Sequence, residues 1–355
     1  MRKLAALALP WLLTMAGAGF ADDRVTYPAV SPHDPLVLPR DHGAHPDYKT
    51  EWWYVTGWLQ TTTGPVGFQV TFFRSRLPFD DGNPSRFAPR QLIVAHVALG
   101  DPAVGHLQHG QRMAREGFGL AEAAIGDTDV TIDDWRLVRD KDGAFAAHAG
   151  SDAFTLDLHM SPTQAPLLQG DRGYSRKGPE EASAYFSIPH LAVTGRLTRA
   201  GHAEMVRGEA WLDREWSSSL LNTRAVGWDW AGLNMDDGSA ITVFRVRDAQ
   251  GGVVWTGGSV RGGDGSLLIL GPGDVTFEAR RRWRSPRTGA MYPVETEVSI
   301  KTPAGVRHMT LRPLFDDQEL DSRPTGGPIY WEGAVSVDGG RGFLELVGYG
   351  GKARL

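Results

Sequence analysis

The sequence predicts an all-β protein of two tandem β-barrel domains with few short helices. Apolar and polar residues alternate with a period of two along many segments, as they do in strands that cover a core with one face. The 44 glycines and 22 prolines are spread along the chain and separate these segments as turn residues. A weak internal repeat, spaced by about half the chain, indicates two related β units.

The predicted strands follow one another along most of the chain. In the segment VGFQVTFFR, the side chains of Val66, Phe68, Val70 and Phe72 would share one face. The best candidate for a helix is the short segment 113–126, MAREGFGLAEAAIG. Other segments with strand character are QLIVAHVAL, AFTLDLHM, AITVFRVRD, GAVSV and GFLELVGY, with expected Asp-Gly turns at 81–82, 142–143 and 237–238.

The internal repeat defines the expected domains. Each copy begins with a tryptophan, continues through two glycines and ends in a Phe-Arg pair: Trp53, Gly57, Gly64 and Phe73-Arg74, then Trp228, Gly232, Gly238 and Phe244-Arg245. We expect an N-terminal barrel over residues 22–200 and a C-terminal barrel over 201–355. A small barrel of this kind can hold one apolar ligand.

The first 21 residues have the composition of a signal peptide. A basic start is followed by an apolar stretch and small residues, with cleavage expected near Ala21. Pro10 interrupts the apolar stretch, which is shorter than the roughly 20 residues of a membrane span. The chain has no cysteine, which excludes an acylated-cysteine anchor and disulfides. We expect a periplasmic or secreted protein that is not integral to the membrane.

The charge of the chain argues against nucleic acid as a partner. The formal net charge is −5 at pH 7, and loss of Arg2 and Lys3 with the signal peptide makes it more negative. Five arginines lie close together in the segment 280–287. In an acidic exported protein, we interpret them as a solvated edge strand and turn.

The segment 45–59, HPDYKTEWWYVTGWL, carries aromatic residues on both faces of an expected strand. Glu51, Trp53 and Val55 would lie on one face, and Trp52, Tyr54, Thr56 and Trp58 on the other. Both faces are therefore expected to be covered. Glu51 has two alternatives: it pairs with an arginine such as Arg74, or it lies in an apolar pocket and donates a proton.

Two further segments combine tryptophan with acidic residues. In GEAWLDREWSSS (208–219), Glu209, Trp211 and Asp213 share a strand face that meets either water or a lined cavity, and Trp216 follows closely. In VGWDWAGLNMDDG (226–238), Asp229 lies between Trp228 and Trp230 and points away from them. Asp229 is either a structural residue that holds a loop or part of a site.

No motif for a metal or a cofactor is present. The chain lacks HExxH, a glycine-rich phosphate loop and the GxSxG motif of serine hydrolases. A histidine such as His96, alone in an apolar strand, is more often a core residue than a metal ligand. We therefore predict neither a metal nor a cofactor.

Seven segments, in order over most of the chain, resemble the exported AttH-type lipocalin-like proteins. They are HPDYKTEWWYVTGWL, AHVALGD, GEAWLDREWSSS, GWDWAGLNMDDG, WRSPRTGAMYP, YWEGAVSV and GFLELVGYG. This family is often labelled as secreted hydrolases and is related to carotenoid 1,2-hydratases. The resemblance implies two lipocalin-like (calycin) β-barrels side by side. No nucleophile or metal motif in this sequence supports the label hydrolase.

The resemblance also suggests where a reaction would occur. In the related hydratases, the acid that protonates an alkene follows an aromatic residue by two positions, which matches Trp211 and Asp213 here. A desolvated Asp213 or Glu51 would donate a proton, and the indoles of Trp53, Trp211 and Trp228 would stabilise a carbocation. Tyr185 or His190 would orient water. Tyr54, Trp216, Asp229 and Trp230 complete the expected ligand-binding residues.

Two other functions remain open. The protein is alternatively a non-enzymatic carrier of a lipid, polyene or hydrophobic peptide for a membrane transporter, which needs an apolar cavity but no acid. A carbohydrate-active protein would instead use tryptophans as sugar platforms and two carboxylates roughly 5 to 9.5 Å apart in an open cleft.

Overall fold

The computed structural model describes residues 25–78, 85 and 87–352, and within these ranges it is built almost wholly from β-strands. The expected signal peptide and the expected turn at 81–82 lie outside the described residues. Among those residues, no helix is long and apolar enough to span a bilayer. The two helical segments are 3-10 turns, η1 (Arg40–His42) and η2 (Arg323–Thr325). The prediction of an all-β fold is confirmed.

The first sheet contains 13 of the described strands and curves into a nearly closed barrel. Its main path runs β4-β3-β2-β1-β13-β12-β9-β8-β7-β6-β5, and β3 and β4 at one end contact β5 and β6 at the other. The bounds are β1 (Thr50–Thr61), β2 (Gly64–Arg76), β3 (Gln91–Gly100), β4 (Gln108–Arg115), β5 (Ala121–Ala123), β6 (Asp129–Ile132), β7 (Trp135–Arg139), β8 (Phe145–Gly150), β9 (Phe154–Pro162), β10 (Leu167–Leu168), β11 (Tyr174–Arg176), β12 (Ala182–Arg199) and β13 (His202–Ser219).

The second sheet contains ten strands in the described part of the chain and repeats the order of the first. Its path is β17-β16-β15-β14-β23-β22-β20-β19-β18, so in both sheets the first strand pairs with the second and with the last. The bounds are β14 (Ala225–Met235), β15 (Ala240–Asp248), β16 (Val253–Arg261), β17 (Leu267–Leu270), β18 (Val275–Arg284), β19 (Met291–Thr302), β20 (Gly305–Pro313), β21 (Glu319–Asp321), β22 (Ile329–Val337) and β23 (Gly340–Val347). This shared order agrees with the Trp-Gly repeat.

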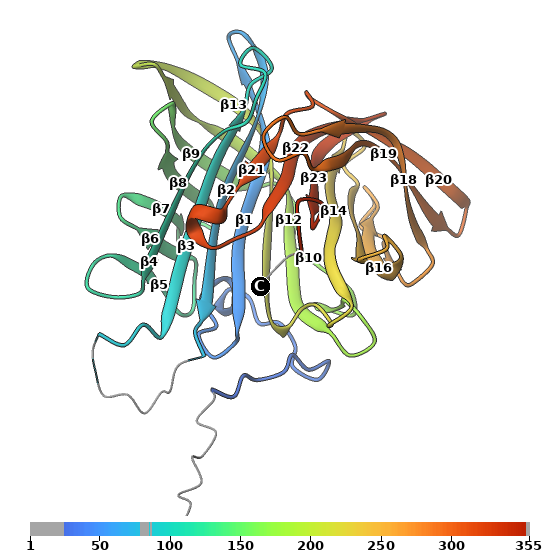
Figure 1. The fold of residues 1–355 in the computed structure, drawn as a ribbon, viewed down its shortest axis with the longest axis horizontal. Helices are drawn as coiled ribbons and strands as arrows, with labels where there is room; N and C mark the ends of the chain where they lie inside the picture. Colours follow the sequence, from blue (N-terminus) through green and yellow to red (C-terminus); the bar gives the residue numbers. More distant parts are fainter. Residues whose placement is uncertain (1–24, 79–84, 86, 353–355) are drawn as a thin grey trace, which may run out of the picture.

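The two sheets lie side by side (Figure 1), with β1, β12 and β13 of the first next to β14, β22 and β23 of the second. A separate apolar cluster fills the space between them. It contains Tyr54 and Trp58 of β1, Trp211 of β13, and Trp230 and Phe244 of the second sheet. Of the aromatic residues predicted for a ligand site, Tyr54, Trp211 and Trp230 therefore occupy the contact between the barrels.

The alternation in β1 has the predicted consequence. Trp53 and Val55 point into the core of the first barrel, whereas Tyr54 and Trp58 point into the cluster between the sheets. Both faces of β1 carry apolar side chains because one face packs in the barrel core and the other packs against the second sheet. The expectation that both faces are buried is confirmed.

Strand β13 also serves two cores. Val206, Ala210 and Leu212 pack inside the first barrel, while Trp211 and Asp213 on the opposite face are buried against the second sheet. The alternative in which this face meets water is therefore wrong for Trp211 and Asp213. It holds only near the start of the strand, where Arg207 is exposed.

The chain changes sheets later than the predicted domain boundary. Residues 200 and 201 form the turn between β12 and β13, and both strands belong to the first sheet. The change of sheet occurs between Ser219 and Ala225. A boundary at 200 would cut a hairpin whose two strands of 18 residues pair along most of their length.

The helix expected over 113–126 is absent from the described structure. The end of β4, a turn and β5 occupy the segment. Gly117, Phe118 and Gly119 all have positive φ angles, which a right-handed helix does not allow. The prediction was wrong because a helical period in so short a segment does not outweigh two closely spaced glycines.

Candidate functional site

Three carboxyl side chains lie between the two sheets, next to aromatic side chains from both. We call this group the interface carboxyl cluster: Asp213 of β13, Glu332 of β22 and Glu345 of β23, with Tyr54 of β1, Tyr185 of β12 and Trp230 of β14. It draws on strands from both barrels. Asp213 and Glu332 are buried, whereas Glu345 is partly exposed.

Asp213 is surrounded by neutral hydrogen-bond donors. Its Oδ2 accepts a hydrogen bond from the Tyr185 hydroxyl at 2.7 Å, and its Oδ1 accepts one from Trp211 Nε1 at 2.6 Å and another from the Ser187 hydroxyl. The described hydrogen bonds and ion pairs bring no basic side chain to this carboxyl. Burial raises the pKa of Asp213 to about 7, although the three donors oppose this shift. Asp213 is therefore partly protonated near neutral pH.

Aromatic side chains extend from Asp213 into the second sheet. Trp230 Nε1 donates a hydrogen bond to the Tyr185 hydroxyl at 3.1 Å. The indole of Trp230 also meets Tyr54 and Trp211 edge to face, with centroid separations of 5.4 and 6.4 Å. The cluster thus presents both π-faces and a carboxyl that can carry a proton.

Glu332 and Glu345 face the cluster from the second sheet. Tyr54 donates a short hydrogen bond to Glu332 Oε1, and Gln69 Nε2 donates to Glu332 Oε2 at 3.1 Å. Trp228 Nε1 donates to Glu345 Oε2 at 2.7 Å. Burial and the proximity of the other carboxyl raise the pKa of Glu332 well above its ordinary value, and burial also raises the pKa of Glu345.

A lysine lies at the edge of the cluster. Lys177 Nζ is 2.9 Å from Glu215 Oε1, and Ser183 donates a short hydrogen bond to the same oxygen. The ammonium group also lies over the rings of Tyr185 and Phe244, at 4.6 and 4.3 Å from their centroids. Lys177 therefore balances the charge of Glu215 and leaves the three cluster carboxyls to neutral donors.

Asp213 is shielded from solvent in this structure. A pocket of about 10 Å³, room for roughly one water, lies beside Trp211 and Trp58. A larger pocket of about 680 Å³ lies elsewhere, between β4 and the turns that follow β6 and β8. Neither of these two pockets is lined by Asp213 or Glu51. Access to Asp213 therefore requires movement of side chains or of the sheets.

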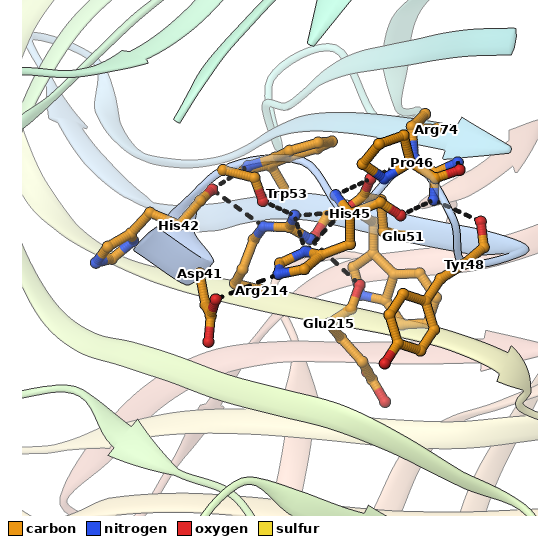
Figure 2. A network of polar contacts seen from close by, with 12 residues as sticks. Asp41, His42, His45, Pro46, Tyr48, Glu51, Trp53, Arg74, Arg214 and Glu215 are labelled. Carbon is orange, nitrogen blue, oxygen red and sulfur yellow. Dashed lines mark hydrogen bonds and ion pairs between the residues drawn. The ribbon is translucent and has the colours of Figure 1, made fainter. Parts of the chain in front are cut away.

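Glu51 lies in a separate network at one end of the first barrel (Figure 2). Its carboxylate forms short ion pairs with Arg74 and Arg214 and accepts a hydrogen bond from the His45 amide at 2.9 Å. Burial would raise the pKa of Glu51, but Arg214, His45 and Arg74 outweigh it and hold the pKa well below its usual range. The geometry supports the alternative in which Glu51 pairs with arginine, and gives no support to proton donation by this group.

Two of the predicted tryptophans belong to the same barrel end. Trp53 Nε1 donates to the His42 carbonyl at 2.9 Å, and the Arg214 guanidinium lies 3.9 Å from a Trp53 ring centroid. Trp216 stacks on His45 with a centroid separation of 3.7 Å. Both side chains pack in the first barrel core and do not join the carboxyl cluster.

Asp229 and His190 also lie apart from the cluster. Asp229 forms ion pairs with Arg245 and Arg247, which favours a structural role, although both partners lie on strand β15 and not in a loop. His190 Nδ1 lies 2.7 Å from Glu209 Oε1, and its Nε2 lies 3.0 Å from the Ser239 carbonyl. Of the predicted site residues, the structure brings together Asp213, Tyr54, Tyr185, Trp211 and Trp230, with Trp228 joined through Glu345.

Glu332 and Glu345 were missed as site residues, although both lie in segments that carry the family resemblance. A signal for them exists in the sequence. Each is a charged residue within an apolar run, YWEGAV for Glu332 and FLELV for Glu345. The two-residue Asp-Gly turn at 338–339 pairs Glu332 with Glu345 across the hairpin. That register places both carboxyls on one face.

The arrangement suits proton transfer in an apolar setting. A protonated carboxyl can donate to a carbon or an oxygen, and nearby π-faces stabilise positive charge. Within the described residues, no group of three or more His, Cys, Asp or Glu side chains is placed to hold a metal ion.

Comparison with known proteins places these features in context. A family model described as AttH-like matches residues 29–349. A crystal structure of a protein assigned as AttH from Nitrosomonas europaea has a TM-score of 0.84 and 49% identity, and the match covers 91% of this chain and 99% of that one. No curated protein matches the chain.

A more distant solved structure shares the fold. Kievitone hydratase from Nectria haematococca has a TM-score of 0.66, covering 91% of this chain and 95% of its own. At 16% identity, this likeness concerns the fold alone. Together, the matches confirm the resemblance to AttH-type proteins and the lipocalin-like architecture.

Proposed function

Because the chain belongs to the AttH-like family, we propose that it binds an apolar polyene, prenyl or lipid ligand between its two barrels and acts on it as a hydratase or hydro-lyase. In this reaction Asp213 donates a proton to a double bond. Kievitone hydratase shares the fold and, by its name, performs hydration, which makes this reaction class a reasonable one to test.

The environment of Asp213 carries this proposal. The carboxyl is 3% exposed and close to indole and phenol groups, and burial raises its pKa to about 7. A general acid works best when its pKa lies near the working pH. Glu51, in contrast, is held as a carboxylate by two arginines and cannot fill this role.

The aromatic side chains supply the second requirement of alkene protonation. Transfer of a proton to a double bond leaves a carbocation, which must be stabilised until water adds. A cation over a desolvated aromatic face gains about 2 kcal/mol or more. Trp211 and Trp230 lie beside the acid and can provide such faces.

Ligand entry requires a change at the edge of the cluster. Trp52 and Trp228 pack against the apolar residues between the sheets but remain partly exposed, as does Glu345. Rotation of the Trp228 side chain would open a path toward the cluster and break its hydrogen bond to Glu345. The ligand would then replace aromatic contacts between the two sheets.

The substitution Asp213→Asn tests the role of the acid. We expect it to reduce hydration of a prenyl alcohol such as geraniol by about 100-fold or more, because a positioned general acid contributes roughly 10² to 10⁴-fold. Product formation is measured by gas chromatography. Asp129→Asn, at a partly exposed aspartate of β6, is the matched control and should retain activity. Full turnover by the Asp213→Asn variant would end the assignment.

Unfolding in urea shows whether the variant is intact. The raised pKa of Asp213 means that its stabilising contribution is complete below an unfolded pKa of 3.8 and declines as pH rises to about 7. Asparagine does not ionise. The Asp213→Asn variant should therefore gain stability relative to the wild type across this pH window, by up to a few kcal/mol (about 1.4 per pKa unit).

Export completes the proposal, and a carrier role is the alternative to catalysis. We propose that residues 1–21 direct the chain out of the cytoplasm, which N-terminal sequencing of the secreted or periplasmic protein tests. A non-enzymatic carrier would use the same space between the barrels. Native mass spectrometry that finds an intact lipid bound, together with no turnover by the wild type, would favour the carrier over the enzyme.

A further inference from the structure

The side chains of Glu332 and Glu345 form a carboxyl pair that proton donation by Asp213 does not use. The two residues are direct cross-strand neighbours on β22 and β23. Residues opposed in this way have Cβ atoms roughly 4.5–5.5 Å apart. Two carboxylates at this spacing repel each other, and buried pairs of this kind hold a shared proton.

The donors that reach the pair are all uncharged. Glu332 accepts from the Tyr54 hydroxyl and the Gln69 amide, and Glu345 accepts from the Trp228 indole. A lysine or arginine in their place would hold both carboxyls ionised. Neutral donors instead allow the pair to keep one proton and still accept another, which is the property of an acid–base group.

Gln69 gives an independent sign that the pair faces a ligand. This side chain is 1% exposed, and its Oε1 has no hydrogen-bond donor in the described part of the chain. Its Nε2 contacts Glu332 at 3.1 Å, so the unpaired oxygen lies beside the carboxyl pair. Buried amide oxygens are nearly always paired, which marks this atom as the acceptor for a group that arrives with the ligand.

We propose that Glu332 and Glu345, together with Gln69, form the water-activating half of the site whose acid is Asp213. This inference rests on the proposed function. The Gln69 oxygen accepts one hydrogen bond from the reacting water and thereby positions it. The carboxyl pair accepts the proton that the water loses.

The step balances in protons and electrons. The Asp213 carboxyl proton and the π-electron pair form the new C–H bond and leave a carbocation. The water oxygen forms the C–O bond, and one water proton passes to the Glu332–Glu345 pair. Glu345 is partly exposed, so the pair can return this proton to solvent, from which Asp213 is recharged.

Shared walls connect the two halves of the site. Tyr54 is the cross-strand neighbour of Asp213 and donates to Glu332. Trp230 is the cross-strand neighbour of Glu345 and donates to Tyr185, which in turn donates to Asp213. A ligand between these side chains would have the acid on the wall formed by the first barrel and the carboxyl pair on the wall formed by the second.

The first experiment needs no substrate. Infrared difference spectra of the wild type, Glu332→Gln and Glu345→Gln are recorded against pH in the absorption band of protonated carboxyls. We expect the wild type to keep this band above pH 6, and each variant to lose part of it. Glu204→Gln is the control, because Glu204 is a partly exposed residue of β13 outside the cluster, and it should leave the band unchanged. Identical bands in the wild type and both pair variants would overturn the shared proton.

The second experiment measures the two steps of the reaction separately, with geraniol as the substrate in D₂O. Deuterium incorporation reports protonation of the alkene, and alcohol formation reports addition of water. Asp213→Asn should lose both deuterium incorporation into the recovered alkene and hydration. Glu332→Gln and Glu345→Gln should retain incorporation, because protonation of the alkene is reversible, while hydration falls by about 100-fold. Glu204→Gln should retain both. Unfolding in urea confirms that each variant is folded.

The outcomes distinguish the inference from the proposed function. Equal loss of deuterium incorporation and hydration in the pair variants would overturn the water-activating role and leave Asp213 as the acid. Full hydration by both pair variants would overturn it as well. Absence of incorporation and of hydration in the wild type would overturn the proposed function, and the role of the pair in that reaction with it.

Discussion

Buried carboxyl groups in this protein fall into two kinds, and the charge of their partners separates them. Glu51 in the first barrel and Asp229 in the second each form ion pairs with two arginines. Within the described part of the chain, Asp213 and Glu332 accept hydrogen bonds from hydroxyl, indole and amide donors only. The first kind forms ion pairs within a barrel, whereas the second lies between the barrels among uncharged donors.

The substitution Glu51→Gln should destabilise the protein strongly. It leaves Arg74 and Arg214, both almost fully buried, without a counterion, and removal of one partner from a buried ion pair costs about 3–5 kcal/mol. Urea unfolding at pH 7 measures the loss. Arg323→Gln, which removes an exposed ion pair with Asp321, should leave the stability nearly unchanged because solvent screens this pair.

The same variant should change the response to acid. The pKa of Glu51 is lowered in the folded protein, so its contribution is present above an unfolded pKa of 4.5 and is lost as pH falls through the lower folded value. The stability of the wild type should therefore decline below about pH 4.5 more steeply than that of Glu51→Gln. Equal slopes would contradict an ionised Glu51.

At the residue scale, sequence reasoning placed Asp213 with Tyr185 and Trp211, which the structure also brings together, but it missed Glu332 and Glu345. The position of Asp213 two residues after Trp211 followed from the family resemblance, and its burial was one of two open alternatives. Arg74 was named as a partner of Glu51, but Arg214 was not, because it arrives from a strand more than 160 residues away. Pairing across such a separation depends on the register of β1 against β13, which the sequence does not reveal.

At the scale of the strand, glycines allow the closest contacts within each sheet. A Cβ on Gly208 of β13 would lie 1.9 Å from the Trp58 carbonyl oxygen of β1. A Cβ on Gly342 of β23 would lie at the same distance from the Gly232 carbonyl oxygen of β14. In each sheet the glycine lies on the last strand, at a position where that strand pairs with the first strand. The two sheets therefore allow the close approach of these strands in the same way.

Replacement of Gly208 by alanine should destabilise the protein by about 1–3 kcal/mol, since the methyl group would overlap a backbone oxygen that can move only with the strand. Thermal unfolding measures the change. Gly271→Ala is the matched control, because its Cβ would meet only the Asp274 carboxylate at 3.6 Å. An equal effect of both substitutions would show that the close approach of β13 to β1 is unimportant.

Strand prediction succeeded where alternation was long and failed where local geometry decided. The opposite faces of β1 and the turns at Asp142-Gly143 and Asp237-Gly238 followed from residue patterns, and Gly143 and Gly238 have the positive φ that such turns need. The arginines of the segment 280–287 lie on the edge strand β18 and its turn, as expected. The helix at 113–126 failed because backbone conformation at the glycines overrode side-chain periodicity.

At the scale of the molecule, polar contacts tie the barrels together on both sides of the aromatic cluster. His96 Nδ1 lies 3.1 Å from the Tyr330 hydroxyl, and the Leu107 amide donates to the Asp317 carbonyl at 2.8 Å. His190 makes a further tie through the Ser239 carbonyl. Separation of the two barrels would break these contacts, whereas rotation of side chains alone would leave them intact.

The tie at His190 should weaken as pH rises. Both ring nitrogens face acceptors, the Glu209 carboxylate and the Ser239 carbonyl, so the charged imidazolium satisfies both. Burial and Arg261 lower the pKa of His190, but these two acceptors outweigh them and raise it above 6.5. Its contribution to stability is complete below pH 6.5 and is lost as pH rises through the raised value.

Unfolding in urea at pH 6 and pH 9 checks this expectation. The wild type should lose more stability between the two values than His190→Gln, whose side chain does not titrate. His308→Gln, at an exposed histidine of the second sheet, should follow the wild type. Equal losses in the wild type and His190→Gln would contradict the charged tie.

Strand β13 restricts how the two halves of the chain can evolve. Successive residues of this strand belong to different compartments, so insertion or deletion of one residue would move Leu212 into the space between the barrels and Asp213 into the lipocalin-like core. A chimera that joins one relative's first barrel to another's second would also change the residues that face Asp213 across the contact between the barrels. A change in the register of β13 would therefore disturb both the first barrel core and the contact between the barrels, even though each barrel has its own sheet.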